Sequence, residues 1–206
     1  MSNLTLPKHK IIVGLTGNIA TGKSAVMRLA GEHGALTLDA DEVVHDILDN
    51  DTAVQEAIAN TFGPSVLLED GRIDRAALGK IVFNEPQALR NLEQIVHPAV
   101  HQNIILQIGQ SESTIILIEA IKLLEGKLHT VCHQIWVTRC SRERQLERLR
   151  ICRGMDMVTA VMRIDAQSPQ EEKVAKADVV IDTDGLMDDT RRQFERAWSR
   201  LLLPEK

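Results

Sequence analysis

Aromatic side chains are scarce in this sequence: they make up 2% of its 206 residues, and tyrosine is absent. Proteins that bind single-stranded nucleic acid stack bases on aromatic rings and attract the backbone with positive charge. The formal net charge here is -5. The composition therefore argues against a nucleic-acid partner, and we expect any affinity for phosphate to come from local sites.

Cysteine and long apolar runs are also scarce. The three cysteines, Cys132, Cys140 and Cys152, are odd in number and form no C-x-x-C pair, which disfavours a disulfide framework and a zinc site. The apolar run near the N-terminus has about five residues, far fewer than a signal segment or the roughly 20 that cross a bilayer. We expect an unprocessed cytoplasmic protein with reduced thiols and no membrane partner.

The sequence does contain 44% hydrophobic residues and an alternation of short β-rich runs with helical patterns. Parallel strands need crossover helices and are buried on both faces. The pattern therefore predicts an α/β sandwich. The runs expected to form its strands are Ile11–Leu15, Ala35–Leu38, Thr114–Ile118, Gln134–Thr138 and Val179–Ile181.

Residues 41–109 form too long a stretch to be one crossover between strands. They have the pattern of several helices, and the breaks between these helices are Phe62-Gly63-Pro64, Asp70-Gly71 and Asn84-Glu85-Pro86. We expect a helical insertion over about 42–109 on the side where the substrate binds, and a single domain over residues 1–206.

The segment from Gly17 to Ser24 matches the pattern G-x-x-x-x-G-K-[ST] between an expected strand and an expected helix. Its N–H groups would cradle the phosphates of ATP, Lys23 would reach the β- and γ-phosphates, and Ser24 would offer a hydroxyl to Mg²⁺. The strand-to-helix setting disfavours a simple glycine-rich turn with a surface lysine. The predicted ATP-binding residues here are Gly17, Asn18, Ile19, Ala20, Thr21, Gly22, Lys23, Ser24 and Ala25, although Ala25 adds no second hydroxyl.

Two carboxylates, Asp39 and Asp41, follow the expected strand that ends at Leu38. Ligands gather at the carboxyl ends of strands in α/β sheets, and residues two apart on an extended backbone point the same way, so both side chains could face one cleft if the strand continues through them. One carboxylate could accept a proton while the other orients Mg²⁺ water. In the structural alternative, Asp41 caps a helix that starts at Glu42, and Asp39 ends the strand.

Between residues 141 and 167, two charged helical segments meet at Arg153-Gly154, which indicates the hinge of a mobile lid. Guanidinium groups on a closing lid stabilise a phosphoryl group in transfer. An ordinary solvated helix uses the same side chains in i,i+4 pairs, and most of these arginines fit that description. We favour Arg148 for ATP binding and Arg153 for catalysis, with Arg163 a weaker candidate, mainly on the family pattern that follows.

Several segments together resemble the dephospho-coenzyme A kinase family: GLTGNIATGKS, LDADEVVHDIL, FGPSVLLEDGRIDRAALGKIVF, LEQIVHPAV and the RIDAQ, EEK and ADVVIDTDG segments. The resemblance covers nearly the whole chain. It implies a P-loop kinase fold, a three-layer sandwich with a five-stranded parallel sheet. It also implies transfer of the ATP γ-phosphate to the ribose 3′-hydroxyl of dephospho-CoA, the last step of coenzyme A biosynthesis.

On the matching positions, the resemblance implies that Asp41 is the general base near the ribose hydroxyl. Asp39 would be its substitute or would orient Mg²⁺, and Arg153 would close over the ATP phosphates. The helices of the insertion would cap the acceptor, with His97 in a structural role. Three departures stand out: a segment Glu119–Glu125 without the family's usual proline and phenylalanine, a spacing of five between Arg148 and Arg153, and Thr183 where asparagine is frequent.

Other classes of protein fit the sequence less well. A nucleoside monophosphate kinase would phosphorylate a phosphate, whereas a base at Asp41 suits a hydroxyl acceptor. A GTPase-like switch would need an N-K-x-D segment, which is missing. A nucleotide-binding protein without catalysis is disfavoured because Lys23, Asp41 and Arg153 are all present. The sequence carries no signal for the oligomeric state.

Overall fold

The structure is a computed structural model that describes residues 9–202. The prediction that the N-terminus holds no signal segment concerns residues that lie partly outside this range. The chain contains two compact units. The helical unit is Asp39–Gln110, and the sheet unit comprises, among the described residues, 9–38 and 111–202. The single domain over 1–206, with its insertion at about 42–109 and lid at about 141–167, stays a prediction.

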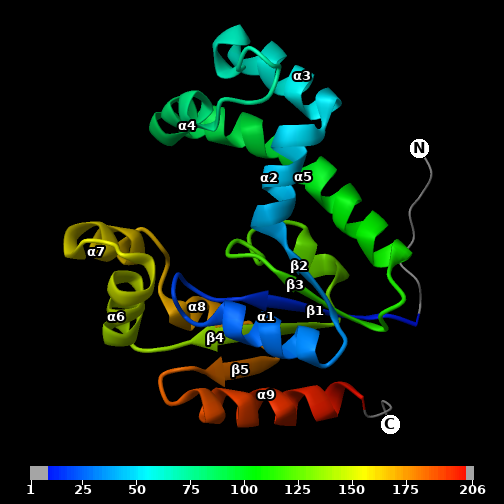
Figure 1. Cartoon of the computed structure of the whole chain (residues 1–206), viewed down its shortest axis with the longest axis vertical. Helices are drawn as coiled ribbons and strands as arrows, with labels where there is room; N and C mark the ends of the chain where they lie inside the picture. Colours follow the sequence, from blue (N-terminus) through cyan, green and yellow to red (C-terminus); the bar gives the residue numbers. More distant parts are fainter. Residues whose placement is uncertain (1–8, 203–206) are drawn as a thin grey trace. The chain divides into compact units, whose positions relative to one another are not determined.

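The sheet unit is built on five strands in the order β2-β3-β1-β4-β5. Strand β1 pairs in parallel with β3 and β4, and β4 pairs in parallel with β5 (Figure 1). The strands are β1 (Ile11–Thr16), β2 (Leu36–Asp39), β3 (Ile115–Glu119), β4 (Gln134–Arg139) and β5 (Val179–Asp182). The predicted α/β fold and its five-stranded parallel sheet are therefore confirmed. Because β1 is the central strand, the loop that follows it starts at the centre of the sheet.

Helices cover the sheet because its strands carry apolar side chains on both faces. Helices α1 (Lys23–Glu32) and α9 (Met187–Leu201) cover one face and bury the side chains of Leu15, Trp136 and Phe194. On the other face, a Cβ at Gly14 would lie 2.6 Å from a methyl carbon of Leu123, so the segment after β3 packs directly onto β1. This close packing holds the carboxyl end of β1, where the phosphate loop begins, in a rigid setting.

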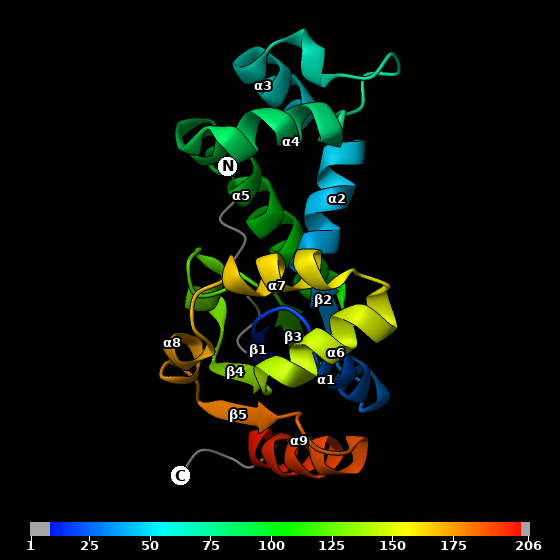
Figure 2. The ribbon, with the colours of Figure 1, turned by 90° about the vertical axis from the view of Figure 1, so that its left-hand side faces the viewer.

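Two helices, α6 (Arg142–Arg153) and α7 (Met157–Asp165), form a hairpin beside the loop that follows β1 (Figure 2). Helix α6 ends at Gly154, whose φ of 62° is a left-handed C-cap that glycine adopts without penalty. The hairpin buries Leu149, Ala160 and Ile164 against Ile19 of the phosphate loop. The two lid segments expected from the sequence are therefore packed on the loop.

The helical unit consists of four helices, with the longest in contact with the other three. They are α2 (Ala40–Asn50), α3 (Thr52–Phe62), α4 (Arg75–Asn84) and α5 (Pro86–Gln110). Helix α3 ends at Gly63, whose φ is 89°, and a short 3-10 turn starts at Pro64. The side chain of Asp74 accepts hydrogen bonds from the first N–H groups of α4 and so caps it.

The three cysteines are free thiols, as the sequence predicts. Burial raises the pKa of Cys132 to about 12, so this thiol is neutral at physiological pH. None of the helices between residues 9 and 202 has the length and apolar character needed to cross a membrane.

Candidate active site

The phosphate loop joins β1 to α1 through a backbone that only small residues tolerate at two points. Gly17 has a φ of 151°, and a Cβ there would lie 2.5 Å from the hydroxyl and 2.6 Å from the carbonyl oxygen of Thr138. Gly22 has a φ of 89° and precedes the first residue of α1. The glycines of the motif are therefore required by backbone conformation and by close packing.

Replacing Gly17 with alanine is expected to lower the free energy of unfolding by about 1–3 kcal/mol and to weaken ATP binding. The reason is that the carbonyl oxygen of Thr138 belongs to β4 and cannot move away from the new methyl group. Gly31→Ala is the matched control, because Gly31 lies in α1 and its added Cβ would be 4.0 Å from the nearest atom, a methyl carbon of Thr37. Denaturant unfolding and the KM for ATP measure both effects, and equal behaviour of the two variants would contradict the prediction.

Lys23 is the first residue of α1, and its side chain reaches across the phosphate loop. Its Nζ donates to the carbonyls of Gly17 at 3.1 Å and Asn18 at 3.3 Å, and lies 3.6 Å from a carboxylate oxygen of Glu119. The Lys23 residue is 7% exposed, whereas the neighbouring Ser24 is exposed. A helix N-terminus with an ammonium group beside it forms a site for an anion. The Ser24 hydroxyl and the Glu119 carboxylate lie near this ammonium or next to it in sequence and are oxygen ligands for a cation.

Side chains from outside the loop donate hydrogen bonds to three consecutive carbonyls of the loop. The donors are Gln145 to the carbonyl of residue 19 at 2.7 Å, Arg148 to residue 20 at 3.0 Å and Thr183 to residue 21 at 2.8 Å. Buried carbonyls require such partners. These hydrogen bonds fix the orientation of three successive peptide groups in a loop that is expected to bind phosphate through N–H groups.

Arg148 joins the lid, the loop and the end of β5. Besides the carbonyl of Ala20, its guanidinium donates to the carbonyl of Thr183 at 2.6 Å and to the Thr183 hydroxyl at 3.0 Å. Thr183, one of the departures from the family pattern, thus uses its hydroxyl to connect Arg148 with Thr21. The contacts of Arg148 support a role in shaping the loop, and its predicted contact with ATP stays a prediction.

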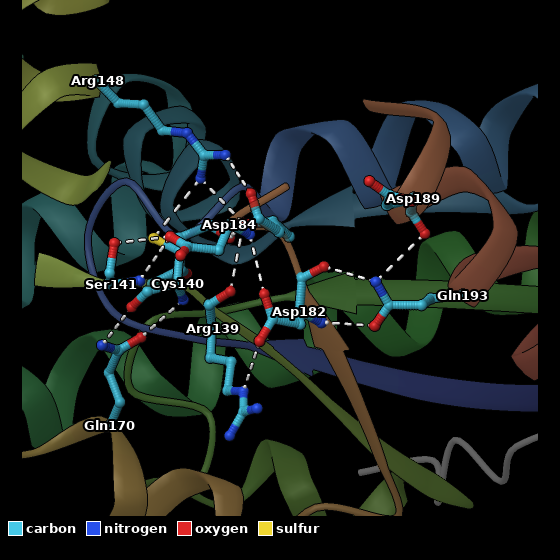
Figure 3. Close-up of polar contacts among 11 residues, drawn as sticks. Arg139, Cys140, Ser141, Arg148, Gln170, Asp182, Asp184, Asp189 and Gln193 are labelled. Carbon is cyan, nitrogen blue, oxygen red and sulfur yellow. Dashed lines mark hydrogen bonds and ion pairs between the residues drawn. The ribbon is translucent and has the colours of Figure 1, made fainter. Parts of the chain in front are cut away.

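The N-terminus of α6 is fixed at the carboxyl ends of β4 and β5. Ser141 caps α6, and both its N–H and its hydroxyl donate to the carboxylate of Asp184 (Figure 3). Hydrogen bonds from Ser141 lower the pKa of Asp184, and the charges of Arg144 and Arg148 lower it further. The start of the α6–α7 hairpin is thereby attached to the sheet by charged hydrogen bonds.

Asp39 is the last residue of β2, and Asp41 does not lie on a continuation of that strand. Asp39 is the N-cap of α2: its carboxylate accepts from the N–H groups of Asp41 at 2.8 Å and Glu42 at 3.4 Å. The helix begins at Ala40, so Asp41 lies in its first turn and is exposed. The strand therefore ends at Asp39, as the structural alternative holds, and does not continue through Asp41; Asp41 as the cap of the helix is wrong, because the cap is Asp39. The catalytic and magnesium roles of these residues stay predictions.

Arg153 and Arg163 are both exposed on the lid. Arg153 is the last residue of α6, directly before the left-handed Gly154, and Arg163 lies in α7. Their position at a helix end and on a hairpin surface is compatible with solvent contact before ATP binds. Their predicted contact with the phosphates stays a prediction.

Several residues at the loop were not selected from the sequence. Glu119 lies in register with Leu15 on the neighbouring strand β1, and its position at the end of β3 was the available signal. Gln145, Gln167 and Lys173 also contact the loop, but they lie in charged helical sequence where such side chains are ordinarily solvated.

The donor set near the loop fits magnesium. Among residues 9–202, no group of three or more His, Cys, Asp or Glu side chains is placed to hold a metal ion. Magnesium needs no such cluster, because it takes one or two protein oxygens together with phosphate oxygens and water. The exposed hydroxyl of Ser24 and the carboxylate of Glu119, beside Lys23, are oxygens of this kind.

A five-stranded parallel sheet whose central strand leads into a lysine-bearing loop at a helix N-terminus is characteristic of P-loop proteins, the class to which P-loop kinases belong. A family model described as dephospho-CoA kinase matches residues 11–189. This chain belongs to the dephospho-CoA kinase family.

Relatives and solved structures agree with this membership. The dephospho-CoA kinase of Carboxydothermus hydrogenoformans is 43% identical over 186 residues, covering 89% of this chain and 90% of that protein. The crystal structure of TT1252 from Thermus thermophilus has a TM-score of 0.83 and 30% identity, covering 95% of this chain and 100% of that chain. Dephospho-CoA kinase from Campylobacter jejuni has a TM-score of 0.61 and 28% identity, covering 94% and 98%. The predicted family is confirmed.

Proposed function

We propose that this chain transfers the γ-phosphate of ATP to the ribose 3′-hydroxyl of dephospho-CoA and so forms coenzyme A. The observation that carries the proposal is a phosphate loop bridged by Lys23 in a chain of this family. The small-molecule partners are ATP and dephospho-CoA. Three free thiols suit a cytoplasmic location, which is part of the same proposal.

The sheet unit binds and activates ATP. Residues 17–25 surround the phosphates with N–H groups and the positive end of α1. The Lys23 ammonium leaves the loop carbonyls and pairs with the β- and γ-phosphates, where charge moves during transfer. Arg148 supports the loop near ATP, and Arg153 closes over the phosphates with the lid. Closure excludes water and so limits ATP hydrolysis.

A bound magnesium ion would supply positive charge that neutralises the phosphates. Ser24 would hold it through its hydroxyl, in the manner typical of P-loop proteins. Asp39 would orient its water, and the Glu119 carboxylate near Lys23 offers a further oxygen. Since Asp39 already caps α2 with one carboxylate oxygen, its second oxygen would be the one to serve this role.

The acceptor side of the reaction is assigned to the helical unit. Asp41 in the first turn of α2 would accept the proton of the ribose 3′-hydroxyl as that oxygen attacks the γ-phosphorus. The first turn of α2 places this carboxylate at the positive end of the helix dipole. The other helices of this unit would surround the remainder of dephospho-CoA.

The decisive experiment compares acceptors with the purified protein, ATP and Mg²⁺. Dephospho-CoA is expected to yield coenzyme A, identified by mass spectrometry and by the position of the new phosphate. An analogue without the 3′-hydroxyl and AMP are expected to yield no phosphorylated product. Failure to convert dephospho-CoA would overturn the proposal, and efficient phosphorylation of AMP would favour a nucleoside monophosphate kinase.

A further inference from the structure

The segment that follows α7 forms hydrogen bonds with the phosphate loop, and the proposed function assigns no role to the residues of this segment. The Ile19 N–H donates to Oε1 of Gln167 at 2.6 Å. The Asn18 side chain donates through Nδ2 to the Ser168 carbonyl at 2.8 Å, and its Oδ1 accepts from Nζ of Lys173 at 2.8 Å. These hydrogen bonds join the segment to two consecutive residues of the loop.

The contact between Lys173 and Asn18 is buried. Asn18 is 4% exposed and Lys173 is 6% exposed. Burial lowers the pKa of Lys173; the charge of Glu125 opposes this effect, and the charge of Lys23 adds to it. A buried ammonium group close to another lysine costs stability, so a role in solubility does not explain it. Its contact with Asn18 indicates a role in shaping the loop.

The lid is attached to Ile19 at both of its ends. The Ile19 carbonyl accepts from Gln145 of α6, at 2.7 Å, whereas the Ile19 N–H donates to Gln167 beyond α7. The Ile19 side chain packs against both helices of the hairpin. The backbone of this residue is therefore held from two directions, and its orientation determines how the following loop residues present their N–H groups.

We propose that Gln167 and Lys173 are positioning residues for ATP, which hold Asn18 and Ile19 so that the loop keeps its phosphate-binding shape. This inference rests on the proposed function, because the shape of the loop matters for catalysis if the loop binds ATP. Both residues act through the loop and are assigned no contact with the reacting atoms. A purely structural role would lower stability and leave the affinity for ATP unchanged once the protein is folded.

The first test replaces Lys173 with methionine, which keeps the length of the side chain and removes its charge and donors. Loss of a buried hydrogen bond is expected to raise the Kd for ATP about tenfold, measured by calorimetry without acceptor. The KM for dephospho-CoA is expected to keep its wild-type value, and Lys173→Arg is expected to restore part of the ATP affinity. Lys176→Met is the matched control, since Lys176 is exposed on the same segment.

The second test is a double-mutant cycle that combines Lys173→Met with Asn18→Ala. If the two side chains act through one contact, the double variant will bind ATP about as weakly as the weaker single variant. Strictly additive effects would overturn the link between Lys173 and Asn18.

The variant Gln167→Met tests the inference independently of Lys173, because it removes only the acceptor of the Ile19 N–H. A rise in the Kd for ATP without a change in the KM for dephospho-CoA is expected. If Lys173→Met fails to fold, this variant decides: wild-type ATP affinity in folded Gln167→Met protein would overturn the inference. Loss of the proposed function would show differently, as absence of coenzyme A formation by the wild-type protein.

Discussion

Replacing Lys23 with methionine is expected to lower kcat/KM for phosphoryl transfer by about 10²- to 10³-fold, the usual effect of removing one charged donor from a transition state. Lys23 carries the ammonium that bridges the loop, and in the proposed function this ammonium pairs with the transferred phosphoryl. Steady-state kinetics with dephospho-CoA and ATP measure the loss. Near-normal kcat/KM would contradict the role assigned to Lys23.

The same substitution also affects stability, so the two effects need to be separated. It removes the positive charge 3.6 Å from Glu119, in a pair whose side chains are 8% and 14% exposed. Breaking a buried ion pair costs about 3 kcal/mol, whereas removing both charges costs much less. The double variant Lys23→Met/Glu119→Gln is therefore expected to unfold at a higher denaturant concentration than Lys23→Met and to remain inactive. Recovery of activity in the double variant would show that the single variant failed through misfolding.

Replacing Asp41 with asparagine is expected to lower kcat by about 10²- to 10⁴-fold, the range for loss of a general base, with the KM for ATP unchanged. Asparagine has nearly the same shape and keeps the first turn of α2, but it cannot accept the hydroxyl proton. Single-turnover measurements of coenzyme A formation would detect the loss directly, because they exclude product release.

Two other aspartates control this experiment. Asp46→Asn removes the same charge from an exposed position of α2 and is expected to keep wild-type kcat. Asp39→Asn keeps a good N-cap for α2, so stability should persist, and any fall in kcat reports on Mg²⁺ or proton transfer. A near-normal kcat in Asp41→Asn together with a large loss in Asp39→Asn would move the base to Asp39.

Local sequence was a reliable guide to the elements of the sheet. All five expected strands are present, and their ends differ from expectation by no more than one residue. The breaks at Gly63 and Gly154 also lie where glycine was expected to end a helix. These features depend on neighbours along the chain, because side-chain patterns and positive φ angles are local properties.

Asp39 and Asp41, at and just after the end of β2, show what local sequence left open. A strand that continued through both residues would have carried them on one face, whereas a helix cap would have ended the strand at Asp39. The Asp39 carboxylate accepts the N–H groups of the next turn, and α2 begins at Ala40. Capping by a short acidic side chain competes with continuation of the strand, and the pattern of hydrophobic residues does not reveal which conformation wins.

The sequence by itself determined that this chain has a phosphate loop in a parallel α/β sheet and carries the motifs of its family, because these signals are contiguous. Only the tertiary structure decided what holds that loop. Gln145, Gln167 and Lys173 are separated by 126, 148 and 155 positions from the loop residues that they contact. Contacts over such separations depend on how whole helices pack against the sheet, and no pattern of neighbouring residues specifies them.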